Sequence, residues 1–341
     1  MEKIDEYEGI KKIYESNVDS FILSDLFLPT NQKDEELIND IKNSKIVIYT
    51  AFTKGYDSLK EPEVIDENCD YICFTNDKEL TSDIWDIRII DDSILDNNRI
   101  AKQFKVLPHK YLPEYKYSFW LDGTFKIKGS IREYIYKFVN SKMLCVVHPE
   151  RDCIYDEAQV SKIFVRYPNY TILKQIETYE EEGMPKHFGL PVLGAIFRKH
   201  NDSEIISLME QWWEEIIKFT NQDQLSFTYL MWKNNFMVSV ASVYYWKNEY
   251  WTKEGEYHHK ETVEDYVTSK NLLKKLEGNI QEVNSLTKEE LSLLINDIEA
   301  LEDESIYLTN IRDHKNNIFE GLKKSKSWKL TKPLRREKSG D

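Results

Sequence analysis

The 341-residue sequence has little cysteine and no apolar stretch at its amino terminus. Its four cysteines, Cys69, Cys73, Cys145 and Cys153, are too few for a disulfide scaffold and lack the paired spacing of a zinc site. This cysteine usage is typical of a reducing cytoplasm. The opening residues are charged and contain no run that predicts a signal peptide or a spanning helix, so we expect a chain that is not secreted by that route.

Basic residues are fewer than acidic ones, and this excludes one class of partner. The 46 basic residues are outnumbered by 60 acidic ones, which gives a formal net charge of -14. Such a chain is not expected to bind nucleic acid, because general binding to a phosphate backbone needs a positive surface. What the sequence does have is 41% apolar and 13% aromatic residues. This is enough for a packed core, as one large domain or as one domain with an appendage.

The basic residues are concentrated at the carboxyl terminus. Residues 323–338 contain eight Lys or Arg and one Glu, interleaved with Trp328, Leu330 and Leu334, whereas residues 1–322 carry a charge of -20. A basic, apolar tail of this kind suits the surface of an anionic bilayer, at about 1 kcal/mol per basic residue near that surface. The alternative, a solvated tail that docks on its own acidic domain, remains open.

Apolar runs and helical spacing alternate along the chain, which predicts an α/β fold. Strands are expected at 45–50, 71–75, 117–121, 143–147 and 192–198, with a short edge strand at 85–90 and helices at 97–111, 131–139 and 203–220. This order predicts a mostly parallel, Rossmann-like sheet flanked by helices, with ligands bound along one edge.

Four regions are expected. Residues 1–44 form a lead-in with an acidic helix at 34–43, and residues 45–261 form the main domain. Residues 262–322 form a helical appendage, in which Thr287 and Glu290 are spaced as a capping box. Its apolar stripe could pack on the main domain or on a second copy of the chain. Residues 323–341 are the basic tail.

Asp122 is the most informative single residue. It follows the apolar run at 117–121, and Gly123 lets the backbone turn away at that point. In an open α/β sheet, ligands bind beyond the carboxyl ends of the strands, so an acid there could hold a metal and, through it, a diphosphate. The competing interpretation is an Asp that accepts backbone hydrogen bonds in a turn.

A basic helix precedes this strand. Arg99, Lys102 and Lys105 are spaced at i, i+3 and i+6, which lets at least two of them reach a common phosphate. An ordinary solvated helix face is the alternative.

Four motifs together resemble a known family. They are Tyr49-Thr50-Ala51 with Gly55-Tyr56-Asp57 and Pro62, Cys73-Phe74-Thr75-Asn76-Asp77, Trp120-Leu121-Asp122-Gly123, and Asp223-Gln224-Leu225-Ser226-Phe227. Over about residues 45–250 the chain resembles a glycosyltransferase-like family once catalogued as domain of unknown function 616. The resemblance implies a GT-A fold that transfers a sugar from a nucleotide diphosphate. Residues 325–335 also resemble a tail of bacterial glycosyltransferases from surface-polysaccharide clusters.

The resemblance implies roles for particular residues. The nucleotide-sugar donor would contact Thr50, Ala51, Tyr56, Asp57, Asp77, Arg99, Lys102, Lys105, Asp122, Gly123 and Gln224. Because the leaving group carries two to three negative charges, the site needs a cation, here Mn²⁺ or Mg²⁺, and basic side chains. Asp122 and His258 would bind this metal. GT-A enzymes usually present Asp-X-Asp, and Thr124 stands in place of the second acid. His258 and His259 could equally be exposed residues of a polar loop.

Two acids are candidates for the general base. Asp223 precedes Gln224 at a helix start, and it could bind sugar hydroxyls or act as the base, or simply be a first-turn acid favoured by the helix dipole. Glu157 is the second candidate, on the acceptor side with His148 and Arg151. His148 could equally be a buried structural residue.

The sequence thus predicts a cytoplasmic, peripherally membrane-associated glycosyltransferase. It would move a sugar from a nucleotide diphosphate donor, expected to be UDP-linked, to a bacterial surface glycan or a lipid-linked acceptor. A sugar nucleotidyltransferase is one alternative, although no Gly-rich phosphate loop follows the first strand. A catalytically silent scaffold for glycan assembly is another.

Overall fold

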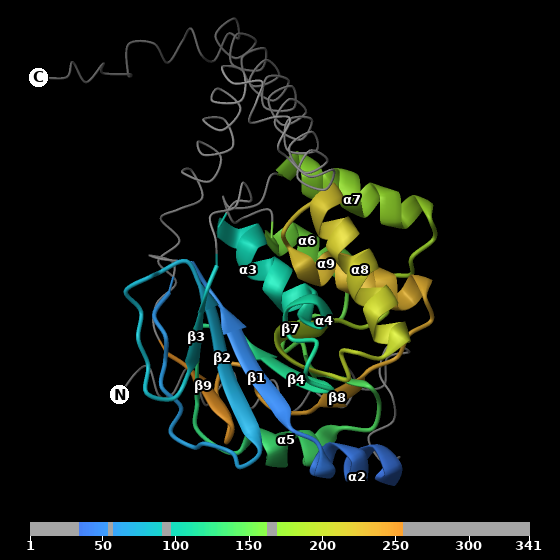
Figure 1. Cartoon of the computed structure of the whole chain (residues 1–341). Coiled ribbons are helices and arrows are strands. Elements are labelled where there is room, and N and C mark those ends of the chain that lie inside the picture. The colour runs from blue at the N-terminus through green and yellow to red at the C-terminus, as the bar shows by residue number, and fades with distance from the viewer. Residues whose placement is uncertain (1–33, 54–56, 91–96, 162–168, 255–341) are drawn as a thin grey trace, which may run out of the picture.

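The computed structural model describes residues 34–53, 57–90, 97–161 and 169–254. Their central element is a seven-stranded sheet (Figure 1). The strand order is β3-β2-β1-β4-β7-β6-β8. The strands are β1 (Ile46–Ala51), β2 (Cys69–Thr75), β3 (Asp86–Ile89), β4 (Tyr117–Leu121), β6 (Met143–Val147), β7 (Pro191–Arg198) and β8 (Ser239–Ala241). The expected α/β fold is confirmed, and β3 is the edge strand that the sequence predicted.

The sheet is mostly parallel, with one reversed strand. β1 pairs in parallel with β2 and β4, β2 with β3, and β6 with β8. β7 is antiparallel to both β4 and β6. Its reversal brings Ala195, in the middle of β7, opposite Leu121 at the end of β4, so that residues 191–194 extend beyond the carboxyl end of β4. The amino end of β7 therefore lies at the edge where the parallel strands have their carboxyl ends.

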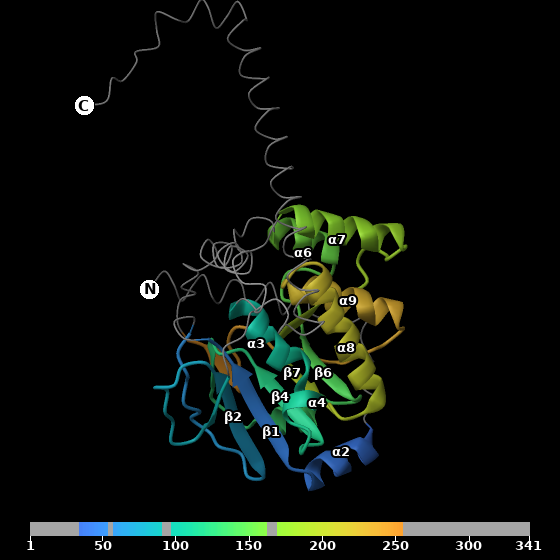
Figure 2. The same ribbon diagram turned by 45° about the horizontal axis from the view of Figure 1, so that its top comes forward.

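Helices cover both faces of the sheet because the central strands are apolar on both sides. All six residues of β1 are buried. Val47 and Tyr49 belong to one core cluster, whereas Ile46 and Ile48 belong to the other, as the period of two in a strand requires. Helices α3 (Asn97–Val106), α8 (Ser203–Lys218) and α9 (Asp223–Lys233) pack over the first face (Figure 2). Helices α2 (Glu35–Asn43) and α5 (Ile131–Phe138) pack on the opposite one.

The helix bounds follow local signals in the sequence. The helices are α2 (Glu35–Asn43), α3 (Asn97–Val106), α4 (Pro108–Tyr111), α5 (Ile131–Phe138), α6 (Ile154–Ser161), α7 (Asn169–Glu181), α8 (Ser203–Lys218) and α9 (Asp223–Lys233). Asp34, Ser130 and Asp202 cap α2, α5 and α8 through their side chains. Helical spacing over 97–111 predicts a helix that ends near Pro108, and α3 does end at Val106. Pro108 has no N–H to continue α3 and instead begins the short helix α4.

A buried arginine fixes the end of α3. The side chain of Arg198, on β7, is fully buried. It donates hydrogen bonds to the hydroxyl of Tyr49 and, at 2.7 Å, to the carbonyl oxygen of Lys105. A cation is favourable at the carboxyl end of a helix, where carbonyl groups lack partners. The position of Lys105 is thus set by contacts from two strands.

A second, two-stranded sheet lies beside the end of β4. It joins β5 (Phe125–Ile127) to β9 (Trp251–Lys253), which run antiparallel. The backbone N–H of Glu254 also donates to the carbonyl of Thr124, at 2.9 Å. The sequence did not predict this pairing, whose strands are three residues long and more than 120 residues apart. It returns the segment around Tyr245 and Trp246 to the turn after Asp122.

Several expected regions lie outside the described residues. These are most of the lead-in, the helical appendage at 262–322, the basic tail at 323–341 and His258. Within the described part of the chain, no helix combines the length and apolarity needed to cross a membrane.

A substitution at Trp212 tests the packing of the core beneath the carboxyl ends of the strands. Trp212 is fully buried on α8, packs on Phe227 and donates its indole N–H to the carbonyl of Asp223 at 2.9 Å. We expect Trp212→Ala to lower the free energy of unfolding by about 3–5 kcal/mol, because it leaves a large cavity. Urea denaturation measures this change. The control Ile89→Ala, at a side chain that is 45% exposed, should cost less than about 0.5 kcal/mol. Equal losses in the two variants would contradict this packing.

Candidate active site

A cavity of about 660 Å³ opens at the carboxyl ends of β1, β4 and β6 and the amino end of β7. Its lining residues include Ala51, Asp57, Lys102, Lys105, Asp122, Gly123, Thr124, His148, Arg151, Glu157, Asp223 and Gln224, all of which the sequence singled out. Asn98, Leu193, Gly194, Asn221, Gln222, Tyr245 and Trp246 also line it. Candidates from six separate stretches of sequence therefore meet at one edge of the sheet, as expected for an α/β fold.

Asp122 forms a turn with its backbone and faces the cavity with its side chain. The turn is closed by a hydrogen bond from the N–H of Phe125 to the carbonyl of Asp122. The carboxylate oxygen Oδ1 accepts a 2.7 Å hydrogen bond from the indole N–H of Trp120 and lies 3.7 Å from Nζ of Lys105. The side chain keeps 34% of its surface exposed. The turn thus involves only the backbone of Asp122, and the carboxylate stays accessible to a ligand.

Lys102 and Lys105 converge on Asp223. Their Nζ atoms lie 2.6 and 2.7 Å from the same carboxylate oxygen, Oδ2. Spacing by three residues places the two lysines on one side of α3, and Asp223 is the first residue of α9. The solvated helix face considered for these lysines is thus wrong, since Lys105 is buried and Lys102 lines the cavity. Arg99 is not among the lining residues.

This cluster perturbs the protonation of its members. Burial alone would raise the pKa of Asp223, but the two ammonium groups outweigh burial and lower its pKa to about 2. Burial lowers the pKa of Lys105, although Asp122 and Asp223 act in the opposite direction. An ionised Asp223 held by two ammonium groups is a weak base in this state. Its role as the catalytic base stays a prediction, which requires that a ligand first separate it from the lysines.

A second cluster of charged side chains lines the cavity at Arg151 and Glu157. Nε of Arg151 donates to Oε2 of Glu157 at 2.6 Å, and the amide of Gln222 donates to Oε1 at 3.0 Å. Burial raises the pKa of Glu157, and Arg151 opposes this rise. The carboxylate is well placed near the cavity, but both oxygens already accept hydrogen bonds. Its role as a base also stays a prediction.

The imidazole ring of His148 is held in place by backbone hydrogen bonds. Its Nδ1 accepts hydrogen bonds from the backbone N–H groups of Glu150 and Arg151, at 3.1 and 2.9 Å. Nδ1 therefore carries no proton. Burial, together with the charge of Arg151, lowers the pKa of His148 to about 3. A neutral imidazole that shapes the loop after β6 fits these contacts.

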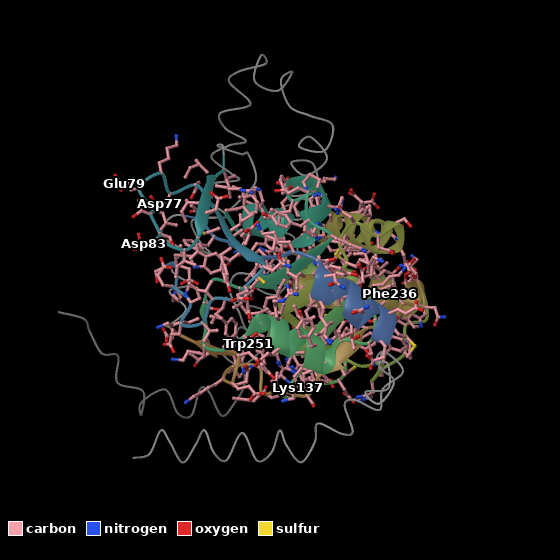
Figure 3. The ribbon with its side chains drawn as sticks, turned by 60° about the horizontal axis from the view of Figure 1, so that its bottom comes forward. Asp77, Glu79, Asp83, Lys137, Phe236 and Trp251 are labelled. Carbon is pink, nitrogen blue, oxygen red and sulfur yellow. The ribbon has the colours of Figure 1, made fainter. Side chains whose placement is uncertain are left out.

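The four remaining candidates for contact with the nucleotide lie in four different places. Asp57 lines the cavity and pairs with Lys60 at 2.7 Å. Thr50 is buried at the end of β1, behind the cavity wall. Asp77 lies with Glu79 and Asp83 on the outer loop after β2 (Figure 3), where it accepts a hydrogen bond from the N–H of Glu79 and does not line the cavity. Tyr56 lies outside the described residues.

Gln224 and Gly194 show how closely the cavity wall is packed. Nε2 of Gln224 donates to the carbonyl of Pro191 at 2.7 Å. A Cβ atom at Gly194 would lie 1.7 Å from the hydroxyl of Tyr245 and 2.8 Å from Oδ2 of Asp122. Only glycine lets these two groups approach β7. A glycine inside an apolar strand is the sequence signal that could have revealed this close approach.

The described residues do not fit a divalent cation held by the protein at Asp122. Thr124 stands in the second acid position, and the ammonium group of Lys105 already lies beside the carboxylate. Where the chain is described, the one group of three ligand-type side chains close together is Cys153, Asp156 and His187, which does not include Asp122. The second metal ligand predicted from the resemblance, His258, lies outside the described residues.

Comparison with known proteins shows the family to which this chain belongs. A profile of the TOD1/MUCI70 glycosyltransferase-like domain matches residues 30–259. The chain belongs to this TOD1/MUCI70 family. Among curated proteins it is similar to the probable hexosyltransferase MUCI70 of Arabidopsis thaliana, with 25% identity over 226 residues. The alignment covers 57% of this chain and 39% of the plant protein, so the chain spans well under two thirds of that relative. The family resemblance inferred from the sequence motifs is confirmed.

Gly194 supplies a test of the cavity wall in this TOD1/MUCI70 domain. We expect Gly194→Ala to destabilise the protein by about 1–3 kcal/mol, because the added methyl group overlaps Tyr245 and crowds Asp122. Adding Tyr245→Phe removes the nearest atom, the hydroxyl oxygen, and should recover part of this loss. The urea denaturation midpoints of the single and double variants measure it. A neutral Gly194→Ala would contradict the close approach.

Proposed function

We propose that this chain is a hexosyltransferase that uses a nucleotide diphosphate sugar, UDP-linked, as its donor. Membership of the glycosyltransferase-like family supports the reaction class. The observation that carries the proposal is the placement of Lys102, Lys105 and Asp122 in one cavity at the carboxyl ends of the strands, with Lys105 3.7 Å from Asp122. Cations there can stabilise the negative charge of a departing diphosphate.

In the proposed reaction, an acceptor hydroxyl oxygen forms a bond to the anomeric carbon of the sugar. The bond from that carbon to the diphosphate oxygen breaks, and its electron pair leaves with the nucleotide diphosphate. Lys102 and Lys105 face this leaving group. The proton of the acceptor hydroxyl passes to a carboxylate, for which Asp223 and Glu157, both in the cavity lining, are the candidates.

The acceptor and the location are further parts of this proposal. A bacterial surface glycan, or its lipid-linked precursor, is proposed as the acceptor from the resemblance of residues 325–335. The basic tail with Trp328 would hold the protein at the cytoplasmic face of an anionic membrane. Residues 262–322 would carry any contact with a second copy. A divalent cation is left out of the proposal, because the described residues offer it one carboxylate with Lys105 already beside it.

The lysines test the proposed donor site. We expect Lys102→Met to weaken UDP binding by about 10- to 100-fold, because it removes a charge-assisted hydrogen bond to the diphosphate. Isothermal titration calorimetry with UDP measures the affinity, and release of UDP from UDP-hexoses measures turnover. Lys110→Met is the matched control, since Lys110 of α4 pairs with Glu210 of α8, outside the cavity. It should bind UDP as the wild type does. No nucleotide binding by the wild-type protein would overturn the proposed function.

Chelation tests the source of the positive charge. We expect UDP affinity to change by less than about threefold in excess EDTA, because the lysine ammonium groups supply the charge that faces the phosphates. The same titration with and without EDTA, followed by added Mn²⁺, measures this. Abolished binding that Mn²⁺ restores would contradict the proposal and assign the charge to a metal.

A further inference from the structure

Two ammonium groups share one carboxylate oxygen in the cavity. One oxygen of Asp223, Oδ2, accepts the ammonium groups of both Lys102 and Lys105. The side chain of Asp223 is 7% exposed and that of Lys105 is 3% exposed, so this cluster is largely removed from water. Lys105 also lies 3.7 Å from Oδ1 of Asp122, so the two ammonium groups are held by two carboxylates. An anion that takes the place of Asp223 at these ammonium groups keeps the buried charges partnered.

The cluster nevertheless lies where a ligand can reach it. All three side chains line the cavity, and Lys102 keeps 21% of its side chain exposed. The described lining residues include five acids, Asp57, Asp122, Glu150, Glu157 and Asp223, and three bases, Lys102, Lys105 and Arg151.

Each of these bases is already paired with an acid. Arg151 contacts Glu150 and Glu157, and both lysines contact Asp223. A diphosphate that enters this cavity therefore has to take its cations from a carboxylate.

Resting on the proposed function, we propose that Asp223 is an internal counter-ion for the diphosphate site. In the empty protein it holds Lys102 and Lys105, and the donor diphosphate displaces it from them. The exchange delivers two ammonium groups to the leaving group and frees a carboxylate to accept a hydrogen bond from a hydroxyl of the bound sugar or acceptor. Donor binding thereby prepares the group that the next step needs.

The place of Asp223 in the fold suits this exchange. It is the first residue of α9, where the helix dipole favours negative charge. The carboxylate thus keeps a favourable electrostatic partner after the lysines turn to the diphosphate. Its backbone stays fixed, because the indole N–H of Trp212 donates to the carbonyl of Asp223. The side chain alone has to move.

Removing the counter-ion should tighten diphosphate binding. In Asp223→Asn the two lysines lose their carboxylate, which destabilises the empty protein and is relieved when a diphosphate binds. We expect UDP to bind about tenfold more tightly than to the wild type, while hexose transfer at saturating donor falls about tenfold or more. A residue with a merely structural role in orienting the lysines would instead weaken UDP binding when it is changed.

Matched variants isolate the exchange. Glu157→Gln removes the same charge from the same cavity, but from a group paired with Arg151, and should not tighten UDP binding. Asp223→Glu keeps the competing carboxylate and should not tighten it either. The double variant Lys102→Met/Asp223→Asn should bind UDP more tightly than Lys102→Met alone, but by a smaller factor than the factor by which Asp223→Asn tightens binding in the wild-type protein. If Asp223→Asn fails to fold, Asp223→Ser removes the same charge with a side chain that is favourable at a helix start.

The experiment is calorimetric titration of the full-length protein and these variants with UDP, with thermal unfolding in parallel. Tighter binding and a larger UDP-induced rise in melting temperature in Asp223→Asn support the exchange. Unchanged or weaker binding in Asp223→Asn, or equal tightening in Glu157→Gln, overturns it. Failure of the proposed function gives a different result, namely a wild-type protein that binds no UDP.

Discussion

The contact between the lysines of α3 and Asp223 of α9 is the interaction on which the candidate site depends. It joins residues 118 positions apart, with an Nζ to Oδ2 distance of 2.7 Å for Lys105. Charges buried this deeply are tolerated only as partners, because each alone would be strongly disfavoured away from water. The fold supports the pairing from both sides. Arg198 and Tyr49 hold the carbonyl of Lys105, and Trp212 holds that of Asp223.

The direction of β7 gives this contact its place at the ligand-binding edge. Because β7 runs antiparallel to β4 and β6, its glycine lies beside the turn after β4 instead of at the far end of the sheet. Gly194 then leaves space for Asp122 and Tyr245 together. The small β5–β9 sheet closes the same corner by returning the chain to Thr124. Asp122 thus lies between Lys105 on one side and the ring of Tyr245 on the other.

The sequence predicted the parts of this arrangement that depend on local patterns. Unbroken apolar runs predicted β1, β2 and β4, and spacing by three residues placed Lys102 and Lys105 on one side of a helix. The strand exit at Asp122 and the helix start at Asp223 were both recognised as site candidates, and the structure brings them into one cavity.

The rest depends on contacts between distant segments, which local patterns do not encode. The two alternatives for Asp223, a sugar-facing acid or a helix-start acid, did not include a pairing with the lysines. His148 and Asp77 carry residue types that suit a site, yet backbone hydrogen bonds engage them. Conversely, Gly194 carries no functional group, and its importance follows only from what approaches it.

Lys102 and Lys105 are proposed to bind the diphosphate of a nucleotide-sugar donor. A crystal structure of the full-length protein with UDP tests it most directly. The account predicts phosphate oxygens within about 2.7–3.0 Å of both Nζ atoms, with the carboxylate of Asp223 turned away from them. Nucleotide density elsewhere on the molecule, or a diphosphate bound while both lysines remain on Asp223, would contradict it.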